Sequence, residues 1–414
     1  MKYNKKMKYN KTTQSSSIVL AACAAVYSVP AIAQDNGADA ESLSDAISGG
    51  SLLLNVRTRY EHADQDGLEE SNAFTLRTRM GWETAPLYGI KGMVEFEDVT
   101  ILGSEDNYNQ AGQSGAGRTV IADIEGTELN RATLSYGTEN TNITLGRQRI
   151  ILDNARFVGN IGWRQNEQTY DAVTLRNTSL SDTTLHYSYV DNVNRIFGDH
   201  HPKGEFGSDS HLINLSYSGL SVGTLTGYAY LIDLENAPGN SSDTFGISLT
   251  GKQSVGDSAS INYRAEYASQ SDAGDNPTDY DADYYRLELG GTSEGYSAGI
   301  GYEVLGSDNG KGFATPLATL HAHNGWADAF LATPTGGLED LFIWGGVKIG
   351  GMPLKVVYHD YSANVGGGDF GSEWDLVLSR GIGDNWKAIA KYSHFDGDSL
   401  PDRDKLWIQA EYSF

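Results

Sequence analysis

The sequence predicts an all-β protein: a transmembrane, antiparallel, up-and-down β-barrel of about 18 strands, with about 16 as the alternative count. Segments with apolar residues at alternate positions recur along most of the chain. The first 33 residues have the form of an export signal. The last segment keeps its alternation up to the final residue, Phe414, as the closing strand of a membrane barrel does.

The alternation is clearest in two segments near the start of the barrel, 52–61 and 74–83. Apolar and neutral side chains fall on one face of each segment, and charged side chains, including Arg57 and Arg77, fall on the other. A helix would spread these arginines around its circumference, whereas a strand collects them on one side. Further strands are predicted at 89–102, 128–137, 141–151, 168–177, 183–192, 210–219, 223–235, 243–253, 258–269, 283–293, 295–306, 339–350, 352–362, 373–382, 385–395 and 404–414.

The links between these segments alternate between short and long, as in an up-and-down barrel. Short links predict periplasmic turns at 137–140, 218–223 and 383–385. Longer, acidic links predict extracellular loops at 62–72, 103–127, 193–209, 270–282 and 396–403.

Two links, 152–168 and 311–337, are too long and too hydrophobic for ordinary exposed loops. They would bury their apolar side chains either inside the lumen, as constrictions, or over the barrel mouth, as a lid. Their candidate constriction residues are Phe157, Trp163, Phe313, His321 and Trp326.

The N-terminal region has a basic leader, a short apolar run and a small-residue site at Ala33. Residues 1–33 are therefore predicted to be a cleaved signal peptide, 34–50 a short periplasmic segment and 51–414 the barrel. A lipoprotein site at Cys23 is the alternative, but it would leave a much shorter hydrophobic region. Because Cys23 is the only cysteine, the mature chain would have no disulfide.

The C-terminal segment LWIQAEYSF resembles the terminal-aromatic signature that the barrel-assembly machinery of bacterial outer membranes recognises. Phe414 is the expected contact with that machinery. The alternative is a soluble sheet that ends on a phenylalanine by chance.

Composition narrows the class of partner and the class of membrane protein. The formal net charge of −24 makes nucleic acid an unsuitable partner, because phosphate binding needs a basic surface. After the leader no apolar stretch is long enough for a membrane-spanning helix. A mean hydropathy of −0.40 still suits a barrel whose strands are apolar on one face only.

Closing the barrel with its apolar faces outward would place a row of arginines in the lumen. The residues concerned are Arg57, Arg59, Arg77 and Arg79, joined by Arg131 and Arg264. Guanidinium groups grip carboxylates with paired hydrogen bonds, so such a lumen favours anionic solutes. The alternative is that these arginines form structural ion pairs with glutamates sharing the space: Glu61, Glu83, Glu95, Glu97, Glu128 and Glu266.

Strict alternation from Leu145 would turn Arg147 and Arg149 toward lipid, where a mid-bilayer charge costs about 2–4 kcal/mol. Either both lie beyond the hydrocarbon band or a bulge near Gly146 turns them inward, and we expect the bulge.

The acidic triplet Asp279, Asp281 and Asp283 imitates the start of a calcium-binding loop, but Tyr284 and Gly290 replace its required glycine and terminal glutamate. We therefore expect no confident metal site. Solvated acid, or divalent cations bridging to lipopolysaccharide, is the preferred interpretation. The sequence has no Walker loop, GxSxG elbow or HExxH motif, so we expect neither an enzyme nor a cofactor.

Seven runs resemble the alginate-export family of outer-membrane porins, in matching order. They are 122–130 (ADIEGTELN), 146–149 (GRQR), 153–160 (DNARFVGN), 162–168 (GWRQNEQ), 194–198 (NRIFG), 315–321 (TPLATLH) and 324–328 (NGWAD). The resemblance implies a barrel in the outer membrane of a Gram-negative bacterium, with an arginine-rich pore for an acidic polysaccharide. The arginines it supplies as pore candidates are Arg147, Arg149, Arg156, Arg164 and Arg195.

The combined expectation is a passive channel whose partners are outer-membrane lipid, lipopolysaccharide and an anionic oligo- or polysaccharide. Export of an alginate-like polymer and uptake of small anionic sugars or organic acids both fit. A non-conducting anchoring or binding barrel is the remaining membrane alternative.

Overall fold

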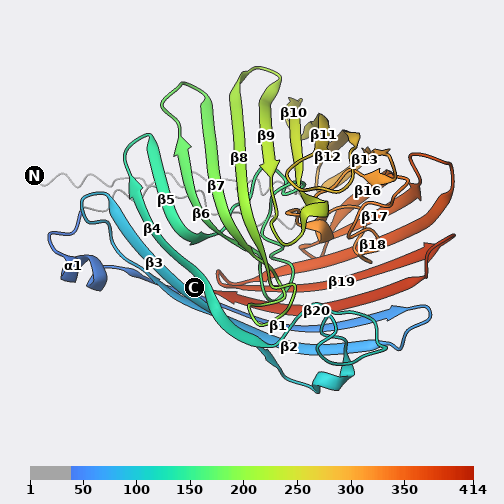
Figure 1. Ribbon diagram of the computed structural model, residues 1–414, viewed down its shortest axis with the longest axis horizontal. Coiled ribbons are helices and arrows are strands. Elements are labelled where there is room, and N and C mark those ends of the chain that lie inside the picture. The colour runs from blue at the N-terminus through green and yellow to red at the C-terminus, as the bar shows by residue number, and fades with distance from the viewer. Residues whose placement is uncertain (1–38) are drawn as a thin grey trace, which may run out of the picture.

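The computed structural model describes residues 39–414, which form a closed antiparallel β-barrel (Figure 1). The barrel has 18 strands, each paired with its neighbours in sequence, and β20 pairs with β1 to close the cylinder. The predicted fold class and strand count are therefore confirmed. The predicted signal peptide lies outside the described residues.

The wall consists of β1 (Ser51–Gln65), β2 (Ser71–Glu83), β3 (Ile90–Ile101), β4 (Gly126–Gly137), β5 (Thr141–Gln148), β6 (Thr169–Asn177), β7 (Thr183–Asn194), β8 (Glu205–Leu220), β9 (Gly223–Ile232), β10 (Ser242–Val255), β11 (Ala259–Asp272), β12 (Asp281–Ser293), β13 (Tyr296–Leu305), β16 (Leu338–Ile349), β17 (Met352–Ser362), β18 (Asp369–Ile382), β19 (Trp386–Gly397) and β20 (Arg403–Ser413). The elements that are not part of the wall are α1 (Leu43–Ser48), the short pair β14 (Ser307–Asp308) and β15 (Lys311–Gly312), and the 3-10 turns η1 (Glu105–Asn107), η2 (Pro238–Asn240) and η3 (Leu320–Ala322).

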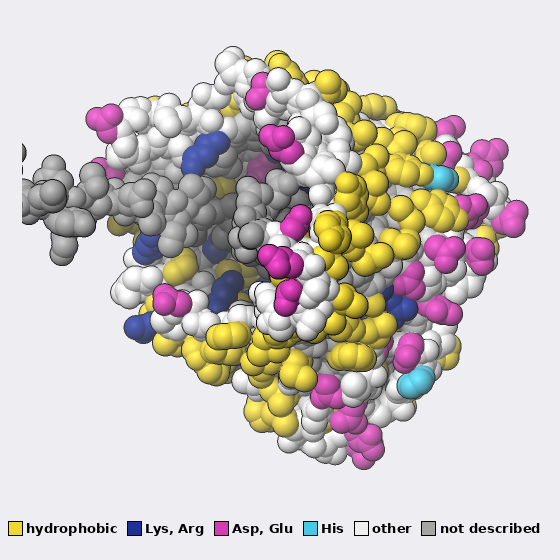
Figure 2. Space-filling view, turned by 90° about the vertical axis from the view of Figure 1, so that its left-hand side faces the viewer, with side chains coloured by type: hydrophobic (Ala, Val, Ile, Leu, Met, Phe, Trp, Pro, Cys, Tyr) yellow, Lys and Arg dark blue, Asp and Glu magenta, His cyan; other side chains and the backbone are white. Residues whose placement is uncertain are grey.

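The outer face of the wall is apolar. Phe96, Leu287 and Ile408 lie on three different strands and keep 54%, 60% and 56% of their surface exposed. Figure 2 shows hydrophobic side chains spread over this outer wall. Within the described part of the chain, none of the helices has the length and apolar character needed to cross a bilayer.

The helix α1 lies at the end of the barrel where the short turns gather (Figure 1). Ser42 caps its N-terminus by accepting a hydrogen bond from the backbone N–H of Asp45. The indole of Trp82 donates to the carbonyl of Ile47 at 3.0 Å, which fastens the helix to β2. This end of the barrel is hollowed, with basic side chains inside the hollow (Figure 2).

Both hydrophobic links fold into the lumen. The link 149–168 leaves β5 and reaches inward-facing side chains of β1 and β2, while the link 306–337 reaches those of β18 to β20. The two links also contact each other through a parallel bridge between Val158 and Leu317. The lumenal alternative is therefore correct, and the lid alternative is wrong.

A third link also enters the lumen, although the sequence analysis predicted it to be an exposed loop. In the link 102–125, Tyr108, Ile121 and Asp123 are fully buried, and Ile121 packs with Ala63 and Ala73 of the first hairpin. The predicted loop 62–72 is also shorter than expected, because β1 extends to Gln65 and β2 begins at Ser71.

The bulge expected near Gly146 is absent from the pairing of β5, whose registers with β4 and β6 run without a shift. Arg147 keeps the parity of exposed Leu145 and pairs with Asp171 of β6 at 2.8 Å. Arg149 reaches the lumen for another reason: β5 ends at Gln148, so the chain has already left the wall.

Candidate functional site

Two arginines on β1 hold the first lumenal link by its backbone. Arg57 donates from Nη1 to the carbonyls of Gly162, Trp163 and Arg164 at 3.1–3.2 Å. Arg59 donates to the carbonyl of Trp163 at 2.5 Å and to Gln409 of β20 at 2.7 Å. Both arginines point into the barrel as predicted, but the link covers them and leaves each 2% exposed or less.

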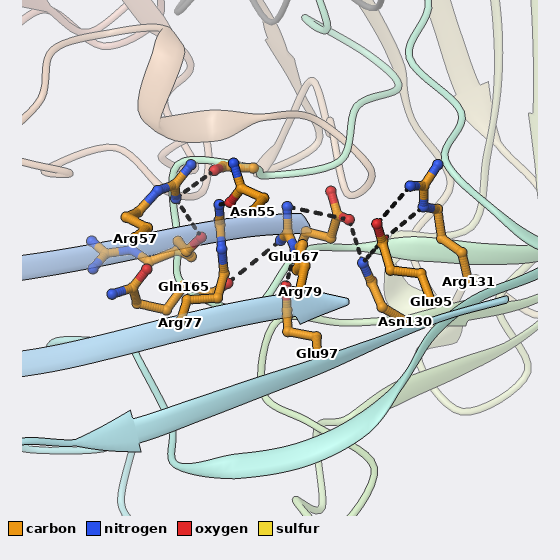
Figure 3. A network of polar contacts seen from close by, with 12 residues as sticks. Asn55, Arg57, Arg77, Arg79, Glu95, Glu97, Asn130, Arg131, Gln165 and Glu167 are labelled. Atoms are coloured by element: carbon orange, nitrogen blue, oxygen red, sulfur yellow. Dashed lines mark hydrogen bonds and ion pairs between the residues drawn. The ribbon is translucent and has the colours of Figure 1, made fainter. Parts of the chain in front are cut away.

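The row continues along the inner wall from β2 to β4 as one polar network (Figure 3). Arg77 contacts Asn55 and lies 3.3 Å from Glu411 of β20. Arg79 pairs with Glu97 of β3 and, at 3.5 Å, with Glu167 of the lumenal link. Charged hydrogen bonds of this kind are the strong ones, so the network braces the wall against the link.

The network ends in a cluster where cations are more exposed than their partners. Arg131 binds Glu95 with two hydrogen bonds of 2.7 and 2.8 Å, and Arg149 binds Glu167 at 2.6 Å. The side chains of Arg131 and Arg149 are 19% and 28% exposed, against 6% for Glu95. Burial alone would raise the pKa of Glu167, but the charges of Arg149 and Arg79 hold that pKa well below its usual range.

A second such cluster lies across the lumen on β11. Arg264 pairs with Glu266 at 2.8 Å and donates to Asn154 of the first lumenal link at 3.3 Å. Its side chain is 12% exposed and that of Glu266 only 1%. The pairs Arg57–Glu411 and Arg286–Glu288 show the opposite order. Pairs such as Arg79–Glu97 and Arg286–Glu303 show the same order with a smaller difference, so the largest excess of cation exposure among these lumenal pairs lies in the two clusters.

The two lumenal links are joined by a buried charge cluster. Arg164 pairs with Glu61 at 3.0 Å and with Asp328 at 3.1 Å. Asp328 also accepts from Lys405 of β20 at 2.6 Å and from His321 at 2.7 Å. Burial would raise the pKa of Asp328, but the charge of Lys405 and the bond from His321 lower it well below its usual range.

Beside this cluster, Lys391 of β19 is enclosed by aromatic rings. Its ammonium lies 3.8 Å from the ring centre of Trp326, 4.3 Å from that of Trp163 and 5.3 Å from that of Trp407. It also lies 2.6 Å from His321 Nε2. Trp163 and Trp326 belong to the two lumenal links and Trp407 to β20, so this enclosure ties both links to the wall.

The remaining constriction candidates pack into the apolar half of the lumen. Phe157 and Phe313 have ring centres 5.9 Å apart and both contact Tyr284 of β12. Arg156 holds this part of the link by pairing with Glu303 at 2.9 Å and donating to Asn324 at 2.9 Å.

Two arginines supplied by the family resemblance lie apart from this network. Arg195, in the link between β7 and β8, stacks on the rings of Phe197 and Phe206 at 4.8 and 4.1 Å. Arg147 stays with Asp171 on the outer side of the wall.

The acidic triplet is not assembled into a metal site. Asp279 and Asp281 are exposed, and Asp283 accepts hydrogen bonds from the hydroxyls of Tyr267 and Tyr285. Across residues 39–414 no three acidic, histidine or cysteine side chains come together as metal ligands.

Sequence reasoning missed the partners that organise the site: Asp123, Glu303, Asp328, Lys391, Lys405 and Glu411. Lys391, Lys405 and Glu411 could have been found by the alternation that located Arg57, because they occupy inward positions of β19 and β20. Asp123 and Asp328 carry no such signal, since they lie in links without a regular period.

No protein-family model matches the sequence, and no curated protein matches it. Solved structures do. OccAB4 of Acinetobacter baumannii superposes with a TM-score of 0.68 at 16% identity, covering 88% of this chain and 98% of that one. OccK9 (OpdG) of Pseudomonas aeruginosa superposes with a TM-score of 0.69 at 16% identity, covering 89% of this chain and 99% of that one. Pseudomonas aeruginosa OpdK with vanillate superposes with a TM-score of 0.70 at 14% identity, covering 89% of this chain and 99% of that one.

At these identities the comparisons show the fold, which is that of outer-membrane porin barrels. A closed barrel with an apolar outer face satisfies its backbone hydrogen bonds within a bilayer. The resemblance to the alginate-export family, by contrast, stays a prediction. The chain has the porin fold, and the predicted outer-membrane location is confirmed.

Proposed function

We propose that the protein is a passive outer-membrane channel for small carboxylated solutes. The observation that carries the proposal is the relative exposure in the Arg131–Glu95–Arg149 cluster, where guanidinium groups face the open lumen and the carboxylate lies beneath them. A solute passing this cluster meets positive charge, which lowers the barrier for anions.

The lumenal links support a small solute rather than a wide, unselective pore. They occupy the space in front of β1, β2 and β18 to β20, and they are fixed there by buried hydrogen bonds and ion pairs. The similar barrel of OpdK was solved with vanillate, a small aromatic carboxylate, which agrees in size and charge with this proposal.

Single-channel current in a planar bilayer under a salt gradient tests the proposal. We expect the reversal potential to lie toward the anion potential and to shift toward the cation potential in the double variant Arg131→Gln/Arg149→Gln. Arg118→Gln is the matched control, because Arg118 lies in the link 102–125 and pairs with the exposed Glu69 of the turn between β1 and β2. Cation preference of the unaltered protein would refute the anion channel, and no current from folded protein would leave an anchoring barrel.

Passage of an alginate-like polymer is the second candidate, and the sequence runs that resemble alginate-export porins favour it. Arg149, Arg156 and Arg164 lie in these runs and in the lumenal network. Oligouronates of increasing length distinguish the two candidates. Longer residence of longer chains would favour polymer passage, whereas equal block by monomeric carboxylates favours the small-solute channel.

A further inference from the structure

Helix α1 is held against the outer side of the wall, at the end with the short turns (Figure 1). The indole that donates to the carbonyl of Ile47 belongs to Trp82, which faces outward from β2 like Met80, a residue 58% exposed. The backbone N–H of Ala85, in the turn after β2, donates to the carbonyl of Ala46 at 2.9 Å. These two contacts place the helix beside the lipid-facing surface of the barrel.

The chain between α1 and β1 passes very close to the same tryptophan. A Cβ on Gly50 would lie 2.5 Å from the indole nitrogen of Trp82 and 2.5 Å from the carbonyl oxygen of Glu83. Only glycine, which has no Cβ, fits at this distance. The sequence at this position therefore favours the docked helix.

One side of α1 carries apolar side chains that the protein covers only in part. Ala46 is buried, whereas Leu43 and Ile47 keep 66% and 50% of their surface exposed. An α-helix turns about 100° per residue, so Leu43 and Ile47, four positions apart, lie side by side and next to Ala46. Asp45 and Ser48 lie on the other side of the helix and are exposed. The helix is therefore amphipathic, with an apolar side that begins at the wall and continues away from it.

Outward aromatic side chains mark the depth at which α1 lies. Tyr136 and Trp386, at the same end of the wall, are 49% and 50% exposed, and the ring of Trp386 lies 5.1 Å from that of Tyr412. Tyr88, in the turn between β2 and β3, is 75% exposed. Aromatic rings of membrane barrels gather where the hydrocarbon meets the lipid headgroups. Trp82 belongs to this belt, so the helix bound to it lies at the headgroup level.

Charge and size decide what covers the exposed apolar side of α1. The segment 39–50 has three acidic residues and no basic one, so attraction to anionic headgroups does not hold it. Stable protein–protein interfaces bury about 1,200–2,000 Å², and two side chains are far too small a surface for a second copy of the chain. The hydrocarbon that already covers the neighbouring wall is the occupant that fits.

We propose that α1 is an interfacial helix, whose Leu43 and Ile47 insert into the hydrocarbon edge of the periplasm-facing leaflet. The side with Asp45 and Ser48 stays in the hydrated headgroup layer, as in other amphipathic helices that lie in the plane of a membrane. The contact fixes the segment that leads into β1 at the membrane surface. It involves the bilayer alone, so it does not depend on which solute the channel carries.

Nitroxide labels on the full chain, refolded into phosphatidylethanolamine–phosphatidylglycerol vesicles, test the position of the helix. Cys23, the only cysteine, is replaced by serine, and single cysteines are introduced as Leu43→Cys, Ser48→Cys, Met80→Cys and Asp275→Cys. Oxygen, which partitions into hydrocarbon, and a water-soluble nickel chelate are the two collision partners. We expect the oxygen-to-nickel collision ratio of Leu43→Cys to lie several-fold above that of Ser48→Cys and toward that of lipid-facing Met80→Cys. The exposed loop variant Asp275→Cys sets the value for water.

Equal ratios at positions 43 and 48 would overturn the interfacial helix. A label at position 43 that neither reagent reaches would also overturn it, because protein would then cover this side of α1.

The double variant Leu43→Ala/Ile47→Ala tests the native side chains without a label. Alanine keeps the helix propensity, so a change reports the lost apolar contact. Hydrogen-exchange protection factors within 43–50 should fall about tenfold or more in vesicles, because most of the buried apolar area of both side chains is removed. Ser44→Ala/Ser48→Ala is the matched control and should keep its protection. Both variants lie outside the wall, so the barrel itself should fold, and equal protection in the two would overturn the proposal.

Discussion

Replacing Asp328 by asparagine removes the carboxylate that ties the second lumenal link to the wall. Asp328 accepts from Lys405, His321 and Arg164. Arg164 keeps Glu61 as a partner, but Lys405, whose side chain is 6% exposed, loses its ion-pair partner. An uncompensated buried charge costs about 3–5 kcal/mol, and the retained Arg164–Glu61 pair favours the lower end. About 3 kcal/mol changes the equilibrium between docked and released link roughly 100-fold.

Single-channel noise and limited proteolysis of the folded barrel measure this change. Asp328→Asn should show frequent current transitions and faster cleavage within 306–337, while the exposed Asp275→Asn should behave as the unaltered protein. The double variant Asp328→Asn/Lys405→Met should recover part of the loss, because it removes the unpaired cation. A single-channel current without additional transitions, together with an unchanged cleavage rate in Asp328→Asn, would refute the view that this cluster holds the link.

Three further outcomes follow from the same physical reasoning. Leu287→Arg places a charge on the lipid face and should lower the free energy of unfolding by about 2–4 kcal/mol, measured by urea unfolding from vesicles. In the control variant Leu287→Val, the urea midpoint of unfolding should barely change. Glu411→Gln weakens the pairs with Arg57 and Arg77 at the closing seam and should cost about 1–3 kcal/mol in the same assay; an unchanged midpoint would mean these pairs add nothing. Because the pKa of His321 is lowered by burial and by Lys391, its stabilising contribution is full above about pH 6.5 and declines below it. Protection factors for hydrogen exchange in 306–337, which correct for the slower intrinsic exchange in acid, should therefore fall on acidification, and less steeply in His321→Gln.

The strands were predictable because the bilayer imposes a period of two on them. Wherever the wall meets lipid, as at Leu287, one face must be apolar, and the sequence shows it. The boundaries were less accurate where strands rise beyond the lipid. β8 begins at Glu205, five residues before the predicted start, in a region whose outward positions are not apolar, so the alternation fades.

The candidate site was predictable only in part. Alternation identified the inward arginines of β1 and β2, but it could not reveal that the first lumenal link covers them, because that contact joins distant parts of the chain. The enclosure of Lys391 by Trp163, Trp326 and Trp407 depends on two links and two strands meeting, which no local pattern encodes. At Arg147 the simple parity rule held, and the added bulge was the error.

The closing seam between β1 and β20 has a kinetic consequence. Arg57 and Glu411 meet across it although they are 354 positions apart in the chain. Contacts of such long sequence separation slow folding, because the chain loses conformational entropy when its ends come together, before the contact forms and stabilises the barrel. The second lumenal link also bonds to the last strand directly, through Lys405 and Asp328, so this contact too is gained only when β20 is in place. Joining of the seam is therefore the natural last and slowest step of assembly.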